Sequence, residues 1–258
     1  MSAASTKRVR QKIMPWLITA VLLILWEVLT RASGISAVIL PPPSDIARAM
    51  VRYHEVLSQH ALQTLLTSVI GFGLALATGI LIGLAIGASS EIYSGIYPLL
   101  VAFNAVPKVA LVPLFVLWCG IGSIPAVLTA FTLSFFPIVV NVATGIATIE
   151  PEMEDVMRSL GARRDEILIK VGIPRAMPYL FASLKVAITL AFVGSVISET
   201  VASNDGIGFL LMGAAARFDV PLVFAGLVVV AVMAVVAYAI CEYLETRVAH
   251  WAFRVRTG

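Results

Sequence analysis

The residue types that most often perform catalysis are scarce in this chain and lie far apart. Its three histidines, His54, His60 and His250, have spacings that suit no metal site, and neither an H-E-x-x-H nor a G-x-S-x-G motif occurs. None of its five lysines follows a glycine, so the glycine–lysine pair of a phosphate-binding P-loop is missing. The sequence therefore predicts no catalytic residue, no metal site and no cofactor bound by this chain.

A second set of residues places polar groups inside apolar segments, where they are costly and usually functional. Lys108, next to Pro107, could present a positive charge to an anion beside a broken helix. The alternative, which we favour, is a lysine that extends toward the cytoplasmic interface. Glu199 suits an ion pair or a gate contact better than solute recognition. The candidate pathway residues are Asn104, Lys108, Ser134, Asn141, Ser195, Ser198 and Glu199.

The densest charge in the chain lies in the middle of the sequence. Six of the fifteen acidic residues fall in 150–166 and five of the eighteen basic residues fall in 158–175, although 60% of the chain is hydrophobic. Four apolar residues recur there at helical spacing and form one stripe on a short helix; they are Met153, Val156, Met157 and Leu160. Such a ridge can insert into a groove of a partner protein, and the alternative is a helix that rests on lipid headgroups.

Both ends of this short helix are marked in the sequence. Pro151 suits its first turn, the acidic residues in 152–155 complement its positive end, and Gly161 suits the position after its last turn. A second amphipathic segment, residues 165–171, leads through Gly172 and Pro174 toward the next apolar run. The loop is therefore predicted to form a helix–turn–helix.

The composition indicates that these residues belong to a polytopic membrane protein. Mean hydropathy is +0.98 and only 13% of residues are charged, with charge-free runs longer than the roughly 20 residues that one helix needs to cross a bilayer. The runs do not alternate in polarity, so helices rather than a barrel are expected. We predict six spans, with a loop at 150–178 between the fourth and the fifth: 13–30, 61–88, 97–118, 124–148, 179–202 and 221–245.

The distribution of basic residues predicts the orientation of these spans. Thirteen lysines and arginines fall on the face that holds both termini and the loop at 150–178, and four fall on the other face. The positive-inside rule therefore places both termini in the cytoplasm. The first apolar segment follows four basic residues and resembles a signal peptide in that respect, but no clear cleavage site follows it, so we expect an uncleaved helix.

One further feature precedes the second span, and another lies within it. Ser44 or Asp45 would cap a short helix on the outer surface after three prolines, with a plain connector as the alternative. Small residues then recur at every fourth position and would let another helix approach closely. We favour packing within the subunit over a dimer interface for this stripe, which comprises Gly71, Ala75, Gly79, Gly83 and Gly87.

The central loop resembles the signature loop of the permease subunits of binding-protein-dependent ABC importers. That loop reads E-A-A, three residues, glycine, nine residues and I-x-L-P. Here Asp155-Val156-Met157, Gly161 and Val171-Gly-Ile173-Pro174 occupy those places, with Asp for Glu and with Val and Met for two alanines. Four other segments are similar to the nitrate/sulfonate/taurine branch: Trp26-Glu27, Leu40-Pro-Pro-Pro-Ser, Val106–Leu114, and Glu199 with Asn204-Asp-Gly-Ile-Gly208.

The resemblance implies an all-α, type I importer permease fold, with one transmembrane permease domain over residues 1–258 of a bacterial inner membrane protein. It implies a non-enzymatic subunit that works with two ATP-binding subunits holding ATP and Mg²⁺, a second permease copy, most simply in a homodimer, and an extracytoplasmic solute-binding protein. Nucleic acid is not among the expected partners. The cargo would be a small solute, with an anion such as nitrate, a sulfonate, taurine or a carboxylate favoured. The residues that would couple to the ATPase are Met153, Asp155, Val156, Met157, Leu160, Gly161, Ala162 and Pro174.

Two other classes of membrane protein compete with this interpretation. An ion-coupled secondary transporter would show internal repeats with paired broken helices, and no convincing repeat is evident. A membrane-embedded enzyme would carry clusters of His, Asp or Cys at membrane depth, and the sequence has none. A secondary transporter would also leave the amphipathic central loop without a purpose.

Overall fold

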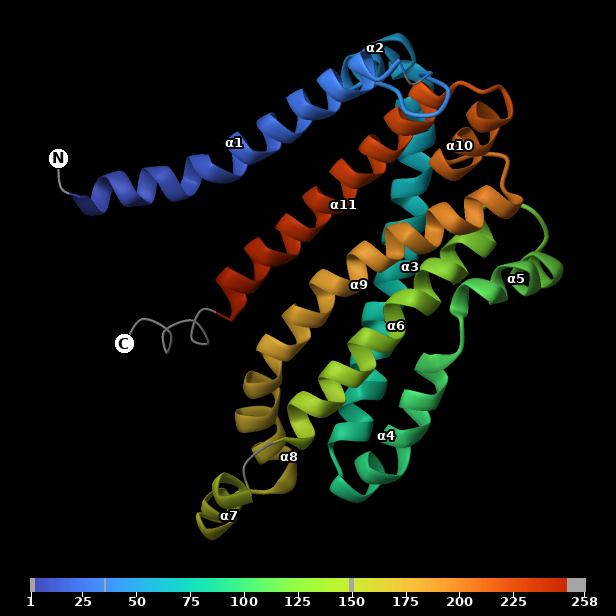
Figure 1. Cartoon of the computed structure of the whole chain (residues 1–258). Coiled ribbons are helices and arrows are strands. Elements are labelled where there is room, and N and C mark those ends of the chain that lie inside the picture. Colours follow the sequence, from blue (N-terminus) through green and yellow to red (C-terminus); the bar gives the residue numbers. More distant parts are fainter. Residues whose placement is uncertain (1–2, 35, 149–150, 250–258) are drawn as a thin grey trace. The chain divides into compact units, whose positions relative to one another are not determined.

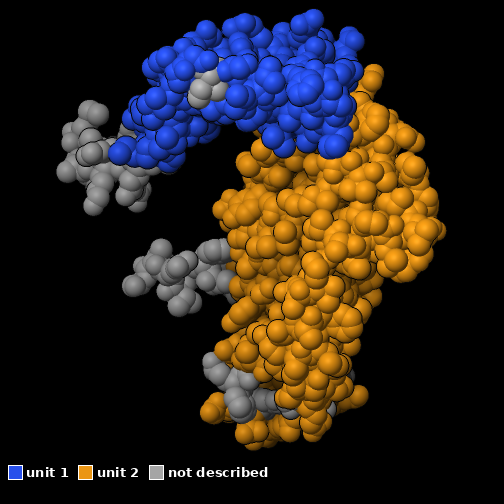
Figure 2. Space-filling model, turned by 45° about the vertical axis from the view of Figure 1, so that its right-hand side comes forward, with its two compact units in different colours: residues 1–58, 210–228 blue, residues 59–209, 229–258 orange. Residues whose placement is uncertain are grey.

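The computed structural model describes residues 3–34, 36–148 and 151–249, and every regular element in this part of the chain is helical (Figure 1). The chain divides into two compact units, coloured separately in Figure 2. The first unit comprises residues 1–58 and 210–228, and the second comprises residues 59–209 and 229–258. Three helices have residues in both units: α3 (His54–Gly87), α10 (Ile207–Ala216) and α11 (Val220–Val248).

The first unit contains α1 (Ala3–Ala32) and the short helix α2 (Pro43–Arg52), so the helix predicted after the prolines is confirmed. The predicted cap is wrong, because Pro42 occupies the N-cap position and Ser44 lies inside the first turn. A proline ring fixes φ near the helical value, and its missing N–H is no loss at this end of a helix. Ser44 instead donates to the Glu27 carboxylate from its backbone N–H (3.0 Å) and its hydroxyl (2.8 Å), which ties α2 to α1.

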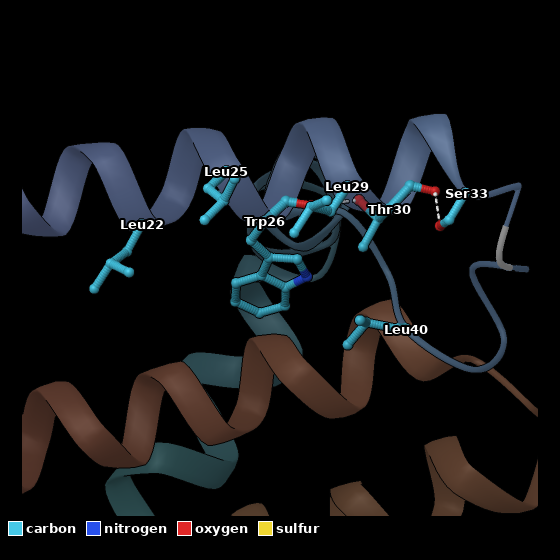
Figure 3. A pocket seen from close by; sticks show the side chains of 7 residues that line it. All are labelled: Leu22, Leu25, Trp26, Leu29, Thr30, Ser33 and Leu40. Atoms are coloured by element: carbon cyan, nitrogen blue, oxygen red, sulfur yellow. Dashed lines mark hydrogen bonds between the residues drawn. The ribbon is translucent and has the colours of Figure 1, made fainter.

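An apolar pocket of about 500 Å³ lies along α1 in the same unit, and the Trp26 indole points into it (Figure 3). The Trp26 ring also contacts Phe224 of α11, with ring centroids 6.0 Å apart. Five of the seven lining residues are apolar, so the pocket offers dispersion contacts but little that would select a polar solute. Its lining residues are Leu22, Leu25, Trp26, Leu29, Thr30, Ser33 and Leu40.

The second unit is built around α6 (Ser123–Ala147) and α9 (Ile173–Ala202), which run side by side along most of their length (Figure 1). Their facing side chains form the core of this unit, with Ile138 and Val142 of α6 and Ala187, Ile188 and Phe192 of α9 all buried. A hydroxyl reinforces this packing, because the buried Ser134 side chain donates to the Ala187 carbonyl at 2.8 Å.

The small-residue stripe of α3 packs against α6, so its prediction as an intramolecular contact is confirmed. A Cβ added to Gly71 would lie 2.6 Å from the Ala130 Cβ, and one added to Gly83 would lie 2.7 Å from Val142. Gly79 and Gly87 meet Ile138 and Ile146 in the same way, and Ala75 is fully buried. The backbones therefore approach closely along four helical turns, which dispersion forces stabilise inside a membrane.

The remaining elements of the second unit form two groups of short helices. Between α3 and α6 lie α4 (Ser90–Ala105), the 3₁₀ turn η1 (Lys108–Leu111) and α5 (Val112–Cys119). Between α6 and α9 lie α7 (Pro151–Ser159), α8 (Arg164–Ile167) and the π-helical turn η2 (Leu168–Gly172).

Five helices in the described residues are long and apolar enough to cross a membrane: Ile13–Ala32, His54–Gly87, Ser123–Ala147, Leu168–Ala202 and Val220–Val248. The third predicted span, 97–118, is wrong as one helix. It is a pair, Glu91–Ala105 and Lys108–Cys119, bent by 73° at the break. Pro107 explains the break, since a proline disfavours helical backbone in the preceding residue, and Val106 is extended (φ −65°, ψ 129°).

Two other features differ from the prediction, one boundary and one additional helix. The fifth span begins at Leu168 rather than at 179, because Gly172 has helical backbone and Pro174 falls in the first turn of α9, where it is tolerated. The apolar helix α10 was not predicted. Its ten residues are too few to cross a bilayer, so hydropathy gave no reason to separate it from the connection between the fifth and sixth spans.

Candidate coupling and translocation sites

The amphipathic helix predicted in the central loop is confirmed as α7, and its apolar stripe is exposed. The side chains of Met153, Val156 and Leu160 are 40%, 59% and 78% exposed, and Met157 is half-buried. Asp155, also predicted for this site, is exposed on the same helix. A stripe of exposed apolar side chains between charged neighbours suits a protein groove, as the sequence indicated.

Gly161 ends α7 as predicted, with a φ of +84° that a residue with a Cβ adopts only at a cost. The Gly161 N–H donates to the Arg158 carbonyl (2.9 Å), and the Ala162 N–H reaches back to the Met157 carbonyl (3.0 Å). These two bonds form the Schellman arrangement, in which the last carbonyls of a helix find donors. The glycine therefore fixes where the exposed stripe stops and where the chain turns.

The second half of the loop is joined to α9 without an interruption. The Glu166 carboxylate caps α8 by accepting from the Arg163 N–H at 3.0 Å, and Lys170 lies 3.2 Å away on the next turn. The hydrogen bond from the Arg163 N–H lowers the pKa of Glu166, and the Lys170 ammonium lowers it further. The wider π-helical turn η2 comes directly before Pro174, whose nitrogen cannot donate to the preceding turn. A helical backbone therefore runs from α8 into α9, so a displacement of the loop is passed to a membrane-spanning helix.

The break between α4 and η1 brings together two predicted pathway residues. The Lys108 ammonium donates to the carbonyl oxygen and to the side-chain oxygen of Asn104, both at 2.9 Å. It also lies 4.8 Å from the centroid of the Phe136 ring on α6, within cation–π distance. Lys108 thus donates a hydrogen bond to a carbonyl group at the C-terminal end of α4, where a positive charge is favoured.

Glu199 occupies a different environment near the end of α9. Its carboxylate is 2% exposed and accepts from the hydroxyls of Thr64 (2.8 Å) and Thr67 (3.2 Å) and from the Gly208 N–H (3.1 Å). The predicted ion pair is wrong for the described residues, because these partners are all neutral. Glu199 instead fastens the segment that follows α9 to α3.

Two glycines enclose the Glu199 carboxylate. Gly206 has a φ of +100°, and a Cβ at that position would collide with the Glu199 carboxyl group. A Cβ at Gly208 would collide with the Val196 carbonyl and lie 2.6 Å from the Glu199 Cβ. The similarity noted for Glu199 and Asn204–Gly208 thus has a structural reason, since only this backbone fits closely around the carboxylate.

The same segment is also fastened to α3 by two further hydrogen bonds. The Ile207 N–H donates to the Thr64 hydroxyl at 2.8 Å, and the Gly206 N–H donates to Nδ1 of His60 at 3.1 Å. Thr64, Thr67 and His60 were not predicted as site residues. They lie at helical spacing on α3, but the sequence does not reveal which face of α3 meets α9.

The other predicted pathway residues are not brought together with Lys108. Ser134 is buried between α6 and α9, and the half-buried Asn141 amide donates within α6 to the Pro137 carbonyl at 2.8 Å. Ser195 and Ser198 are buried on α9, and their hydroxyls have no hydrogen-bond partner among the described residues. Buried hydroxyls of this kind are often satisfied by an internal water.

Sequence reasoning also missed an ion pair between two membrane-spanning helices. Lys185 of α9 lies 2.6 Å from the Glu245 carboxylate of α11, and both side chains are largely buried. The two residues are 60 positions apart, and the sequence offered no signal that would pair them. Because each charge compensates the other, this pair resembles a structural fastening between helices.

Long apolar helices, joined in one place by an exposed amphipathic helix, identify the chain as a polytopic membrane protein. The family model of the binding-protein-dependent transport system inner membrane component matches residues 75–250, more than half of the chain, and the chain belongs to this family. The chain is the membrane-spanning permease subunit of an ABC importer. Membership implies an ATPase and a solute-binding protein as partners and the inner membrane as the location. It does not support the secondary-transporter and enzyme alternatives.

Similarity extends over nearly the whole chain. The formylaminopyrimidine transport permease protein ThiX of Halalkalibacterium halodurans is 30% identical over 95% of this chain and 98% of its own length. The taurine transport system permease protein TauC of Escherichia coli is 27% identical over 90% of this chain and 87% of its own. The second of these belongs to the branch that the sequence indicated. An inward-facing structure of the MetNI methionine ABC transporter superposes with a TM-score of 0.64 and 16% identity, covering 79% of this chain and 99% of that one, which shows the fold.

Proposed function

We propose that α7 seats in a groove of the partner ATPase and that its movement drives transport of a small anion. One observation carries the coupling role: the exposed stripe of α7 ends at Gly161, and the following segment continues as helix into α9. Closure of the ATPase would displace α7 and pull on α9 directly. The residues assigned to this contact are those predicted from the sequence: Met153, Asp155, Val156, Met157, Leu160, Gly161, Ala162 and Pro174.

The proposed assembly contains two copies of this permease, two ATPase subunits and one external binding protein. ATP and Mg²⁺ would be held by the ATPase chains, and this chain would bind no cofactor and hydrolyse nothing itself. The excess of basic residues near α7 and both termini supports a cytoplasmic position for all three. One permease domain over residues 1–258 would then present its coupling loop to the ATPase and its opposite face to the binding protein.

The choice of an anionic cargo rests on two lines of support. One similar protein is by its name a taurine permease, and taurine carries a sulfonate group. The second is the Lys108 ammonium at the broken third span, which no acidic side chain among the described residues neutralises. The name of another similar protein includes formylaminopyrimidine, so the family as such does not fix the charge of its cargo.

The test of the coupling role is a substitution within the exposed stripe. Val156→Glu should weaken association with the ATPase at least tenfold, because it places a charge in the centre of an apolar contact. The control is Ser159→Gln, which adds polar bulk to the same helix away from the stripe. Both variants are reconstituted in lipid nanodiscs with the ATPase, and its co-purification and its stimulation by ligand-loaded binding protein are measured. Equal association and stimulation in both variants would disprove the proposed seat.

A further inference from the structure

The break between α4 and η1 lies beside the midpoint of α6. Phe136 is adjacent to the central residue of α6, a helix that runs from Ser123 to Ala147 and is long enough to cross the bilayer. The Lys108 ammonium is 4.8 Å from the centroid of the Phe136 ring. The Lys108 ammonium therefore lies beside the midpoint of α6, a position that favours a charge at mid-depth over a lysine that extends toward an interface.

The neighbours of the ammonium are all neutral. It donates to two oxygens of Asn104 and lies against one aromatic ring, and no carboxylate in the described part of the chain pairs with it. Lys185 differs in this respect, because Glu245 compensates its charge at 2.6 Å. The break thus carries a net positive charge at a depth where charge is expensive.

The surface around Lys108 is exposed and has irregular backbone, which is unsuited to contact with lipid. Asn104 and Pro107 are exposed in the single chain, and the side chains of Val106 and Val109 are each 45% exposed. Val106 and Pro107 have non-helical backbone. Irregular backbone and a charged group are tolerated at membrane depth only where they face protein or a water-filled cavity. An uncompensated charge on such a surface attracts a mobile counter-ion.

We propose that this break is a mid-membrane contact site for the transported anion, an inference that rests on the proposed function. The Lys108 ammonium neutralises a carboxylate, a sulfonate or an inorganic oxyanion as it passes, and the Asn104 amide offers a further hydrogen-bond donor. A single lysine suits this task, because it acts as a compact point charge and does not grip an oxyanion with two parallel bonds as arginine does. Weak attraction is what transport requires, since the anion must also leave.

The experiment measures the charge preference of a thiol placed beside Lys108, and it needs no knowledge of the natural solute. Val106→Cys is introduced into a chain in which Cys119 is replaced by Ser and Cys241 by Ala. The chain is reconstituted in nanodiscs with its ATPase. Modification rates are compared for an anionic methanethiosulfonate, the sulfonatoethyl reagent, and a cationic one, the trimethylammonioethyl reagent, with and without ATP and Mg²⁺. The ratio of the two rates cancels any general effect of Lys108 on the reactivity of the thiol.

The expected result is a preference for the anionic reagent that depends on Lys108. Lys108→Gln should lower the anionic-to-cationic rate ratio about tenfold, the effect of one charge some 6 Å away in an aqueous cavity. Lys108→Arg should retain the ratio. Lys170→Gln is the matched control, because it removes a positive charge from an exposed side chain in the segment between α8 and α9, far along the chain from the break, and should leave the ratio unchanged. In the chain that keeps Lys108, the same charge should make the ratio exceed that of free 2-mercaptoethanol about tenfold.

Two results would overturn the proposal. A cysteine at 106 that reacts with neither reagent in any nucleotide state would place the break against protein. A rate ratio that Lys108→Gln leaves unchanged would show that the charge of Lys108 does not act on a charged solute at the break. Failure of the coupling proposal is distinguishable, since it concerns association with the ATPase and not the rate ratio at residue 106.

Discussion

Lys108 and Glu199 are both ionisable residues within membrane-spanning segments, but their surroundings differ in a way that separates two roles. Glu199 is 2% exposed, accepts three hydrogen bonds and is enclosed by Gly206 and Gly208. Lys108 is half-buried on an exposed break, with two Asn104 oxygens and one aromatic ring as its partners. The sequence alone placed both in one group of pathway candidates.

The contrast shows that polarity at membrane depth indicates function only where a ligand can reach it. The space around Glu199 is so filled that even an added methyl group collides, so a solute has no access. A buried carboxylate held by several donors stabilises one arrangement of the segments that provide them. The break at Lys108 offers the opposite combination, an accessible surface and a charge without a counter-ion. Substitutions at the two sites should therefore affect stability and transport in opposite proportions.

The largest effect on stability is expected for Glu199→Ala. It removes the acceptor for Thr64, Thr67 and the Gly208 N–H, and each buried donor left unsatisfied costs about 1–3 kcal/mol. The free energy of unfolding should fall by about 3–5 kcal/mol. Thermal unfolding in nanodiscs measures this, with Glu199→Gln as the control that keeps one carbonyl acceptor. If the two variants unfold at the same temperature, the hydrogen bonds to the carboxylate do not hold this segment.

A smaller loss of stability is expected for Gly208→Ala, which tests the packing around Glu199 and leaves its carboxylate in place. The new methyl group would collide with the Val196 carbonyl, and overpacking of this kind costs about 1–3 kcal/mol. Gly73→Ala is the matched control on α3, because a Cβ there meets no atom within 4 Å. It should be neutral or slightly stabilising, as alanine favours helix. A Gly208→Ala variant as stable as Gly73→Ala would mean that the segment after α9 can shift at little cost.

The sequence predicted the parts of this molecule that depend on local pattern. Hydropathy located five of the spans, the spacing of apolar residues predicted the stripe of α7, and Gly161 predicted where that helix ends. The partners of Glu199 could not be predicted, because they depend on which faces of α3 and α9 meet. The interruption at Pro107 and Lys108 was visible in the sequence, but the 73° bend between the two helices was not. Residues whose role depends on tertiary packing were thus the ones that sequence reasoning grouped incorrectly.

The smallest effect on stability and the largest effect on transport should coincide in Lys108→Met. The substitution removes hydrogen bonds from the ammonium to neutral oxygens at an exposed helix end, where water can replace them at a cost of about 1 kcal/mol, and it leaves no buried carboxylate without a partner. Methionine keeps the length and the contact with Phe136 but not the charge. Uptake of taurine or another sulfonate in proteoliposomes, delivered by a binding protein that accepts it, should fall at least tenfold, while stimulation of the ATPase by that loaded protein persists. A variant that loses uptake and ATPase stimulation together would show that Lys108 acts in the conformational change. A variant that loses as much stability as Glu199→Ala would show that Lys108 is a structural residue. Either outcome would contradict the difference drawn between the two sites.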